Sequence, residues 1–161
     1  MIDPSVFVAP GAHILGQVNI GAESSIWFGS IVRGDVDTIT IGHGCNVQDG
    51  AVIHVSRGFP VVLEDWVSVA HGAVVHGSYI EEGTLIGIGA IVLDGARVGK
   101  ETVVGAGSLV VGGTVIPPRS LVLGQPARVV RELSDEEVES FRETAYRYVK
   151  YAQRYLKNEW K

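Results

Sequence analysis

Residues 80–110 read IEEGTLIGIGAIVLDGARVGKETVVGAGSLV, and an aliphatic residue returns at every sixth position from Ile80 to Val110. The same period continues to Val122 and, toward the N-terminus, back to Val8 with three shifts of phase. A six-residue period fits neither the 3.6-residue turn of a helix nor the two-residue alternation of one strand, but it is typical of parallel β-helices. The sequence therefore predicts an all-β solenoid of hexapeptide repeats with about six coils.

The shifts of phase locate insertions in the repeat. Val32 and Ile41 are separated by more than one hexad, and so are Ile53 and Leu63, which predicts loops at 34–38 and 56–60. If three hexads make one triangular coil, the aliphatic residues point into the prism and small residues occupy the corners, where glycine tolerates positive φ.

The composition changes after Pro117 and Pro118. Ser134 and Glu137 form an S-x-x-E capping box, which predicts the start of a helix. An apolar stripe follows at spacings of three and four: Val138, Phe141, Ala145, Val149, Ala152 and Leu156. We therefore expect a β-helix over residues 1–128 and, over 129–161, a C-terminal α-helix packed on the prism.

Composition and charge argue against several classes of partner. The 161 residues carry 13 Lys and Arg against 18 Asp and Glu, a net charge of −5, with no basic stretch for nucleic acid or an anionic membrane. No run approaches 18 apolar residues, and the N-terminus does not read as a secretory signal. Cys45 is the single cysteine and predicts a small buried residue. These features favour a cytoplasmic protein.

The repeat register predicts on which side of the prism His54, His71 and His76 lie. His54 and His76 each follow a repeat-start aliphatic residue and are one full coil apart, so we expect them to stack on one face. Arg33 lies one coil before His54 in the same column. His71 comes two places after Val69, which puts it at a corner on another side of the prism.

A threefold oligomer would bring the three histidines together. In a homotrimer, the His54 and His76 face of one chain can meet the His71 corner of the next, which gives three sites. Three imidazoles with an open fourth position are the ligand set of a catalytic Zn²⁺ site, in which the pKa of bound water falls to about 7. We therefore predict a shared metal site.

The chain resembles the γ-class carbonic anhydrases, which are trimeric left-handed parallel β-helices; some short bacterial and archaeal members are labelled ferripyochelin-binding-like. The resemblance rests on R-G-D at 33–35, G-x-x-x-N-V-Q-D at 42–49, His54, and A-H-G-x-x-x-H-G at 70–77. It implies a left-handed β-helix that hydrates CO₂ to bicarbonate by metal-hydroxide chemistry.

The resemblance also implies roles for individual residues. His54 and His76 of one subunit and His71 of its neighbour would bind Zn²⁺, with Fe²⁺ or Co²⁺ as alternatives. Gln48 would hydrogen-bond the reacting water or bicarbonate. The catalytic set also includes Arg33 and Asp49, paired across the interface, with Asp35 close by.

Two positions depart from the pattern of active members. Those members carry acidic residues as a proton shuttle, where this chain has Val36 and Arg57. A matched acid–base group typically contributes 10²–10⁴-fold, so turnover is expected to be slow or limited by buffer. Two alternatives therefore stay open: a catalytically weak or inactive metal-binding trimeric assembly module, and a hexapeptide-repeat acyltransferase.

Overall fold

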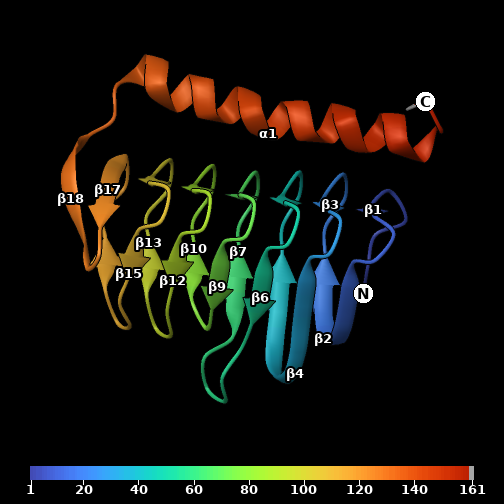
Figure 1. The fold of residues 1–161 in the computed structure, drawn as a ribbon, viewed down its shortest axis with the longest axis horizontal. Helices are drawn as coiled ribbons and strands as arrows, with labels where there is room; N and C mark the ends of the chain where they lie inside the picture. The colour runs from blue at the N-terminus through green and yellow to red at the C-terminus, as the bar shows by residue number, and fades with distance from the viewer. Residues whose placement is uncertain (160–161) are drawn as a thin grey trace.

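The structure is a computed structural model that describes residues 1–159 as a prism of short parallel strands with one helix along its side (Figure 1). The strands stack coil upon coil into two sheets. The N-terminus and the last turn of the helix lie at the same end of the prism, because the helix returns along its length (Figure 1). The predicted β-solenoid of about six turns with a C-terminal helix is thereby confirmed.

The ten-stranded sheet covers two faces of the prism. Its strands are β2 (His13–Ile20), β4 (Ile31–Ile41), β6 (Val52–His54), β7 (Val61–Leu63), β9 (Val74–His76), β10 (Tyr79–Ile80), β12 (Ile91–Val92), β13 (Arg97–Val98), β15 (Leu109–Val110) and β16 (Val115–Ile116). This sheet continues around one edge of the prism, because the first residues of β4 pair with β6 and its last residues pair with β7. We call the face of β6, β9, β12 and β15 the first face, and that of β7, β10, β13 and β16 the second face.

The eight-stranded sheet forms the third face. Its strands are β1 (Phe7–Val8), β3 (Ser25–Ile26), β5 (Asn46–Val47), β8 (Ser68–Val69), β11 (Leu85–Ile86), β14 (Val103–Val104), β17 (Ser120–Gly124) and β18 (Ala127–Glu132). All neighbours are parallel except β17 and β18, which form an antiparallel pair at the end of the sheet. The hexad period did not predict this last pairing.

The two predicted insertions differ. The loop at 56–60 is confirmed: it projects from the prism on the side away from the helix (Figure 1), and Ser56 bridges to Phe59. The loop expected at 34–38 is wrong, because β4 runs unbroken and pairs with β2, Gly16 opposite Gly34. A Cβ on Gly16, whose φ is +81°, would stand 2.5 Å from the Gly34 carbonyl carbon, so glycine lets the two strands approach and bend together.

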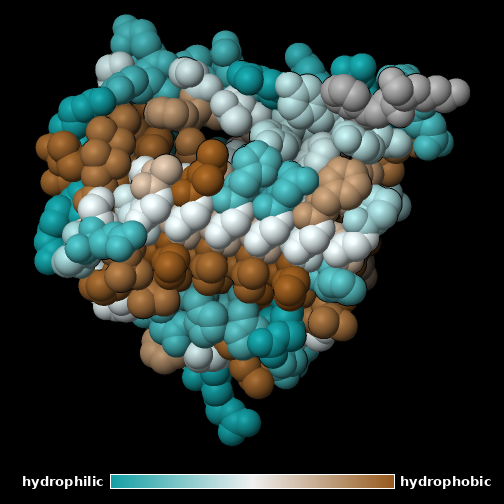
Figure 2. All heavy atoms as spheres, in the orientation of Figure 1, coloured by the Kyte–Doolittle hydropathy of each residue, from teal (hydrophilic) through white to brown (hydrophobic). Residues whose placement is uncertain are grey.

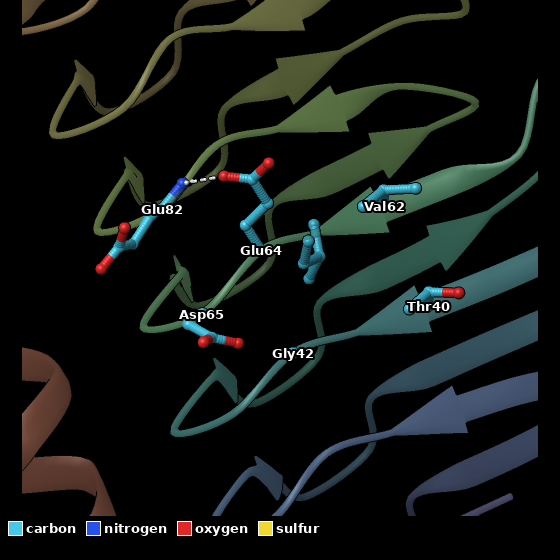
Figure 3. Close-up of a pocket in the computed structure, with 7 residues that line it drawn as sticks. Thr40, Gly42, Val62, Glu64, Asp65 and Glu82 are labelled. Atoms are coloured by element: carbon cyan, nitrogen blue, oxygen red, sulfur yellow. Dashed lines mark hydrogen bonds between the residues drawn. The ribbon is translucent and has the colours of Figure 1, made fainter.

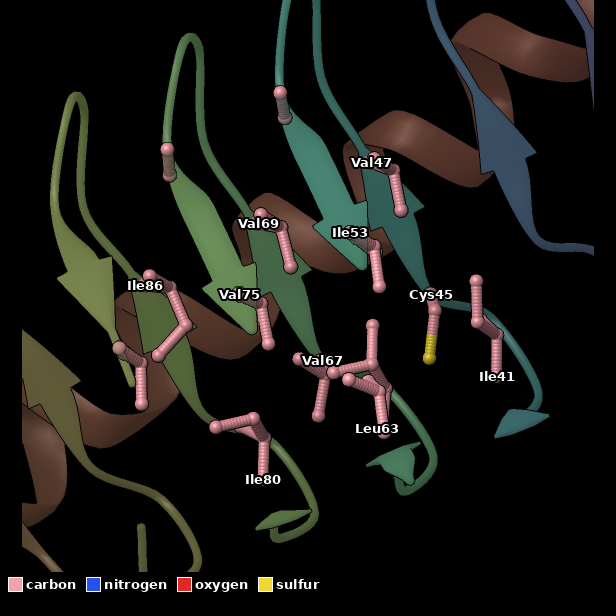
Figure 4. Packing of buried hydrophobic residues seen from close by; sticks show 14 of the residues in the cluster. Ile41, Cys45, Val47, Ile53, Leu63, Val67, Val69, Val75, Ile80 and Ile86 are labelled. Carbon is pink, nitrogen blue, oxygen red and sulfur yellow. The ribbon is translucent and has the colours of Figure 1, made fainter. Parts of the chain in front are cut away.

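The core is a column of repeat-start aliphatic side chains. Those of Ile53, Leu63 and Val69 are at most 1% exposed, and they point from different faces toward one interior (Figure 4). Burying each stabilises the fold by about 1.5–3 kcal/mol. Val8 is an exception at 41% exposed, because β1 is the edge strand and no further coil covers it. Cys45 is buried as predicted, and burial raises the pKa of its thiol to about 12.

Helix α1 (Asp135–Leu156) begins at the predicted capping box. The Ser134 hydroxyl accepts from the Glu137 amide, and the Glu137 carboxylate accepts from the Ser134 amide. Most of the predicted apolar stripe packs on the prism, but Leu156 is exposed. Near the C-terminal end, its tyrosines pack against Phe7 and Trp27 of the first coils. Over residues 1–159, no helix combines the length and apolar character needed to cross a bilayer.

Candidate metal centre

The first group of predicted site residues lies in one column on the first face. In the β4–β6–β9 ladder, Arg33 pairs with His54, and His54 pairs with His76. Their preceding neighbours point into the core, so alternation along each strand turns these three side chains outward. This order is the one that the hexad count predicts.

The His54 and His76 imidazoles, which we call the imidazole pair, face one another. His54 Nδ1 lies 2.9 Å from His76 Nε2. On the far sides of the rings, His54 Nε2 lies 3.0 Å from Asp35 Oδ1, and His76 Nδ1 hydrogen-bonds Asp94 Oδ1. An ionised carboxylate only accepts hydrogen bonds, so each neutral ring carries its proton on the nitrogen that faces the carboxylate.

This arrangement fits a metal ion. When each ring carries its proton on the outer nitrogen, both inner nitrogens have lone pairs that can coordinate a cation. Imidazole nitrogen backed by a carboxylate is a recurrent zinc-ligand arrangement. The rings are partly accessible, with 20% of the His54 side chain and 27% of the His76 side chain exposed.

The two carboxylates behind the pair are held as anions. The hydrogen bond with His54 lowers the pKa of Asp35, and the neighbouring Arg33 guanidinium, which hydrogen-bonds the other oxygen, lowers it further. The pKa of Asp94 is lowered by its hydrogen bond with His76 and by a second from Ser56. Each imidazole therefore has a negative charge behind it at neutral pH.

Asp94 is a site residue that the sequence reasoning missed. It belongs to no motif quoted for the resemblance, and L-D-G at 93–95 reads as an ordinary corner of the repeat. Asp94 lies 18 residues after His76, whereas β9 and β12 pair at a separation of 17, with Val75 opposite Val92, so Asp94 comes one position past the residue in register with His76. Counting one coil forward from His76 by this register leads to Leu93, the residue directly before Asp94.

The second group of predicted residues lies on the third face and its corner. His71 follows β8, and its Nδ1 lies 3.1 Å from Asp49 Oδ2. Gln48 follows β5 and is only 4% exposed. Its Nε2 donates to Asn46 Oδ1 at 2.9 Å, and Asn46 Nδ2 donates to Ser68 Oγ at 2.8 Å. This amide ladder fixes the orientation of Gln48.

Gln48 and His71 open into one groove between the third face and α1. The groove has a volume of about 550 Å³ and is also lined by Ile88, Arg147 and Tyr148. The His71 side chain is 47% exposed, so it can reach beyond its own chain. We call this second group, Gln48, Asp49 and His71, the His71 corner.

Within one chain, the predicted site residues fall into two separate groups, which we call candidate half-sites. The structure brings Arg33, Asp35 and the imidazole pair together on the first face, and leaves the His71 corner on another sheet. Among residues 1–159, no three His, Cys, Asp or Glu side chains converge as a metal-binding group. Within the chain Arg33 pairs with Asp35, and Asp49 with His71. The roles assigned to these residues remain predictions.

An acidic pocket on the second face lies outside both half-sites. It is lined by Thr40, Gly42, Val62, Leu63, Glu64, Asp65 and Glu82 (Figure 3). The Glu64 carboxylate accepts from the Tyr79 hydroxyl at 2.5 Å and from the Glu82 amide at 3.0 Å. The hydrogen bond to Glu64 raises the pKa of Tyr79. Tyr79 thus hydrogen-bonds a residue that lines this pocket.

Comparison with known proteins places the chain among hexapeptide-repeat proteins. Residues 77–112 match the family described as "Bacterial transferase hexapeptide (six repeats)". A protein of Methanocaldococcus jannaschii named "Probable carbonic anhydrase" is 58% identical over 150 residues, which cover 93% of this chain and 94% of that protein.

Two further relatives extend the comparison. "Gamma carbonic anhydrase 1, mitochondrial" of Arabidopsis thaliana is 42% identical over 95% of this chain, and the match spans 58% of the plant protein. A crystal structure from Bacillus cereus, described as a putative acetyltransferase, superposes with a TM-score of 0.94 at 44% identity. That match covers 96% of this chain and 90% of the other.

Proposed function

This chain belongs to the γ-class carbonic anhydrase family of hexapeptide-repeat proteins, and on that premise we propose that it catalyses the reversible hydration of CO₂ to bicarbonate. The observation that carries the proposal is the division of one candidate site into two half-sites on different faces. The imidazole pair and the His71 corner complete one another only when they come from two copies of the chain.

A homotrimer joins the half-sites. In a ring of three, the first face of each chain meets the His71 corner of the next, which makes three equivalent sites. Exposed apolar side chains support such packing. Leu15 is in register with Arg33 and 51% exposed, and Ile88 beside the groove is 59% exposed. Figure 2 shows hydrophobic residues gathered in a band across the viewed face.

The three histidines would hold one divalent metal ion. His54 and His76 supply two neutral nitrogens, and His71 of the neighbour supplies the third. A divalent ion held there supplies Lewis acidity, which brings the pKa of water to about 7. Zn²⁺ is our proposal for the metal, and Fe²⁺ or Co²⁺ also suits imidazole ligands. The lone buried cysteine agrees with a cytoplasmic location, which we also propose.

The remaining site residues orient the reactants. Asn46 accepts from one N–H of the Gln48 amide, which leaves the second N–H to donate to CO₂, water or bicarbonate and the carbonyl oxygen to accept from water or bicarbonate. Arg33 holds Asp35, and Asp35 holds His54, so this ion pair positions one ligand. In the trimer, Asp49 would give up its contact with His71 and pair with Arg33 of the neighbouring chain. Held reactants need less reorganisation to reach the reacting geometry.

Each turnover also releases a proton, because CO₂ and water give bicarbonate and H⁺. The positions where a shuttle carboxylate is expected are Val36, which is 48% exposed, and Arg57, which is exposed in the 56–60 loop. Neither side chain can accept and pass on a proton at neutral pH. We therefore expect the rate of hydration to rise with the concentration of an imidazole buffer.

Metal content and CO₂ hydration test this function together. We expect about one Zn²⁺ or Fe²⁺ per chain, by plasma mass spectrometry, in untagged protein purified anaerobically, and hydration in a stopped-flow indicator assay. His71→Ala should lose metal and activity while keeping the fold, whereas His43→Ala, at a corner against Trp66, should keep both. Full metal content in the His71→Ala protein would contradict the shared site.

Two other functions have some support. An assembly module that uses the metal as a structural clasp would bind metal and leave CO₂ unhydrated. The description of the Bacillus cereus relative favours an acyltransferase, in which one histidine acts as a general base. Acetyl-CoA binding at micromolar concentration, with no bound metal, would favour the acyltransferase over our proposal.

A further inference from the structure

Asp94 stands directly behind His76, on the side away from His54. It follows β12, and the backbone ladder holds it from both neighbouring coils: Gly95 donates to the Gly77 carbonyl, and Gly113 donates to the Asp94 carbonyl. Its side chain is 35% exposed. The carboxylate is thus carried on rigid backbone at a fixed place relative to the His76 ring.

The chain leaves room for this carboxylate. A Cβ on Gly77 would stand 3.0 Å from Asp94 Cγ and 2.9 Å from Phe59 Cβ, so a larger residue at 77 would push the Asp94 side chain or the 56–60 loop aside. Gly77 also has a φ of +51°, which L side chains rarely adopt. The lack of a side chain at Gly77 therefore leaves space for the Asp94 carboxylate beside His76.

We propose that Asp94 is a positioning residue that fixes the ring orientation and tautomer of His76 and so presents His76 Nε2 to the metal. The inference rests on the proposed function of this site. Without an acceptor at Nδ1, the ring can rotate or carry its proton on Nε2, where the proton blocks coordination. With Asp94 in place, Nδ1 keeps the proton and Nε2 keeps its lone pair toward His54.

Asp94 and Asp35 do not have the same task. Asp35 is shared between His54 and the Arg33 guanidinium, so part of its charge is already neutralised. Asp94 accepts its other side-chain hydrogen bond from the Ser56 hydroxyl, which is neutral and offsets none of the negative charge. His76 therefore lies beside a carboxylate that no guanidinium neutralises. The Ser56 bond also connects the 56–60 loop to the metal ligand, which makes Ser56 a second, weaker control on the same ring.

The test combines metal affinity with a measurement that needs no metal. Zn²⁺ affinity of the full-length chain is measured by competition with a chromogenic chelator for wild type, Asp94→Ala, Asp94→Asn and Ser56→Ala. Loss of such an outer partner costs about 10–100-fold in affinity. We expect that loss in Asp94→Ala, at unchanged stoichiometry, and a smaller one in Asp94→Asn, whose amide oxygen can still accept. Glu82→Gln, which removes an exposed charge on the second face, is the matched control and should bind as wild type does.

The second readout is the His76 tautomer in the metal-free chain, from ring ¹⁵N shifts at about pH 8.5, two units above the ordinary histidine pKa. We expect Nδ1–H in wild type and its loss in Asp94→Ala. A proton on Nε2 in wild type, or wild-type affinity in Asp94→Ala, would overturn the inference. A wild-type chain that binds no Zn²⁺ but shows the Asp94-dependent tautomer would instead overturn the proposed function and leave the control of His76 by Asp94 standing.

Discussion

The amide ladder under Gln48 gives a prediction whose size can be worked out from the structure. Asn46 is fully buried and makes two side-chain hydrogen bonds, one from Gln48 and one to Ser68. Asn46→Ala removes both and leaves two buried polar groups without partners. A buried polar group left without a partner costs about 1–3 kcal/mol, so the free energy of unfolding should fall by about 2–6 kcal/mol. Ser68→Ala removes only one bond and should cost about half as much.

The assay is urea unfolding followed by circular dichroism, at one chain concentration for all variants because assembly contributes to stability. CO₂ hydration is measured on the same preparations. Asn46→Ala should also lower kcat/KM, because the Gln48 amide loses its fixed orientation, whereas Ser68→Ala should leave kcat/KM close to wild type. An Asn46→Ala protein with wild-type stability and activity would refute the ladder as the support of Gln48.

Two further predictions concern residues outside the site. The Ser78 hydroxyl is the one buried side-chain oxygen without a partner in the described part of the chain, so Ser78→Ala should leave the melting temperature unchanged or raise it; a clear fall by calorimetry would contradict this. Hydrogen bonds from Arg131 and from the Ser134 amide lower the pKa of Glu137 to about 2, against an ordinary value of 4.5. Its contribution to stability is therefore complete above about pH 4.5 and is lost as the pH falls through about 2, so Glu137→Gln should reduce the pH dependence of thermal unfolding in this window.

The sequence predicted the solenoid because one physical constraint repeats along it. Each hexad must point one aliphatic side chain into the core. The six-residue spacing of buried residues such as Ile86, Val92 and Val98 therefore indicates which residues face inward. The same register placed Arg33, His54 and His76 in one column, since strand pairing fixes which residues stack.

The features that could not be predicted depend on backbone approach or on single contacts. The bend shared by β2 and β4 requires Gly16 to meet Gly34, and the hydrophobic pattern carries no sign of that contact. Asp94 was missed because an acidic residue at a polar corner has no distinctive neighbours in the sequence. Its partner His76 is also out of register with it by one position, because the strand register leads from His76 to Leu93.

The central claim is that each site combines the imidazole pair of one chain with His71 of the next, and subunit mixing tests it directly. His54→Ala and His71→Ala chains should each lack metal and activity alone. When the two mutant chains are refolded together, random assortment should complete the site at about a quarter of the interfaces in a ring of three. Mixing His54→Ala with His76→Ala is the matched control, because both changes fall on the same half-site and no interface becomes complete.

We predict recovery of bound metal and CO₂ hydration in the first mixture and none in the second. No recovery in the first mixture, or equal recovery in both, would contradict a metal site shared between subunits.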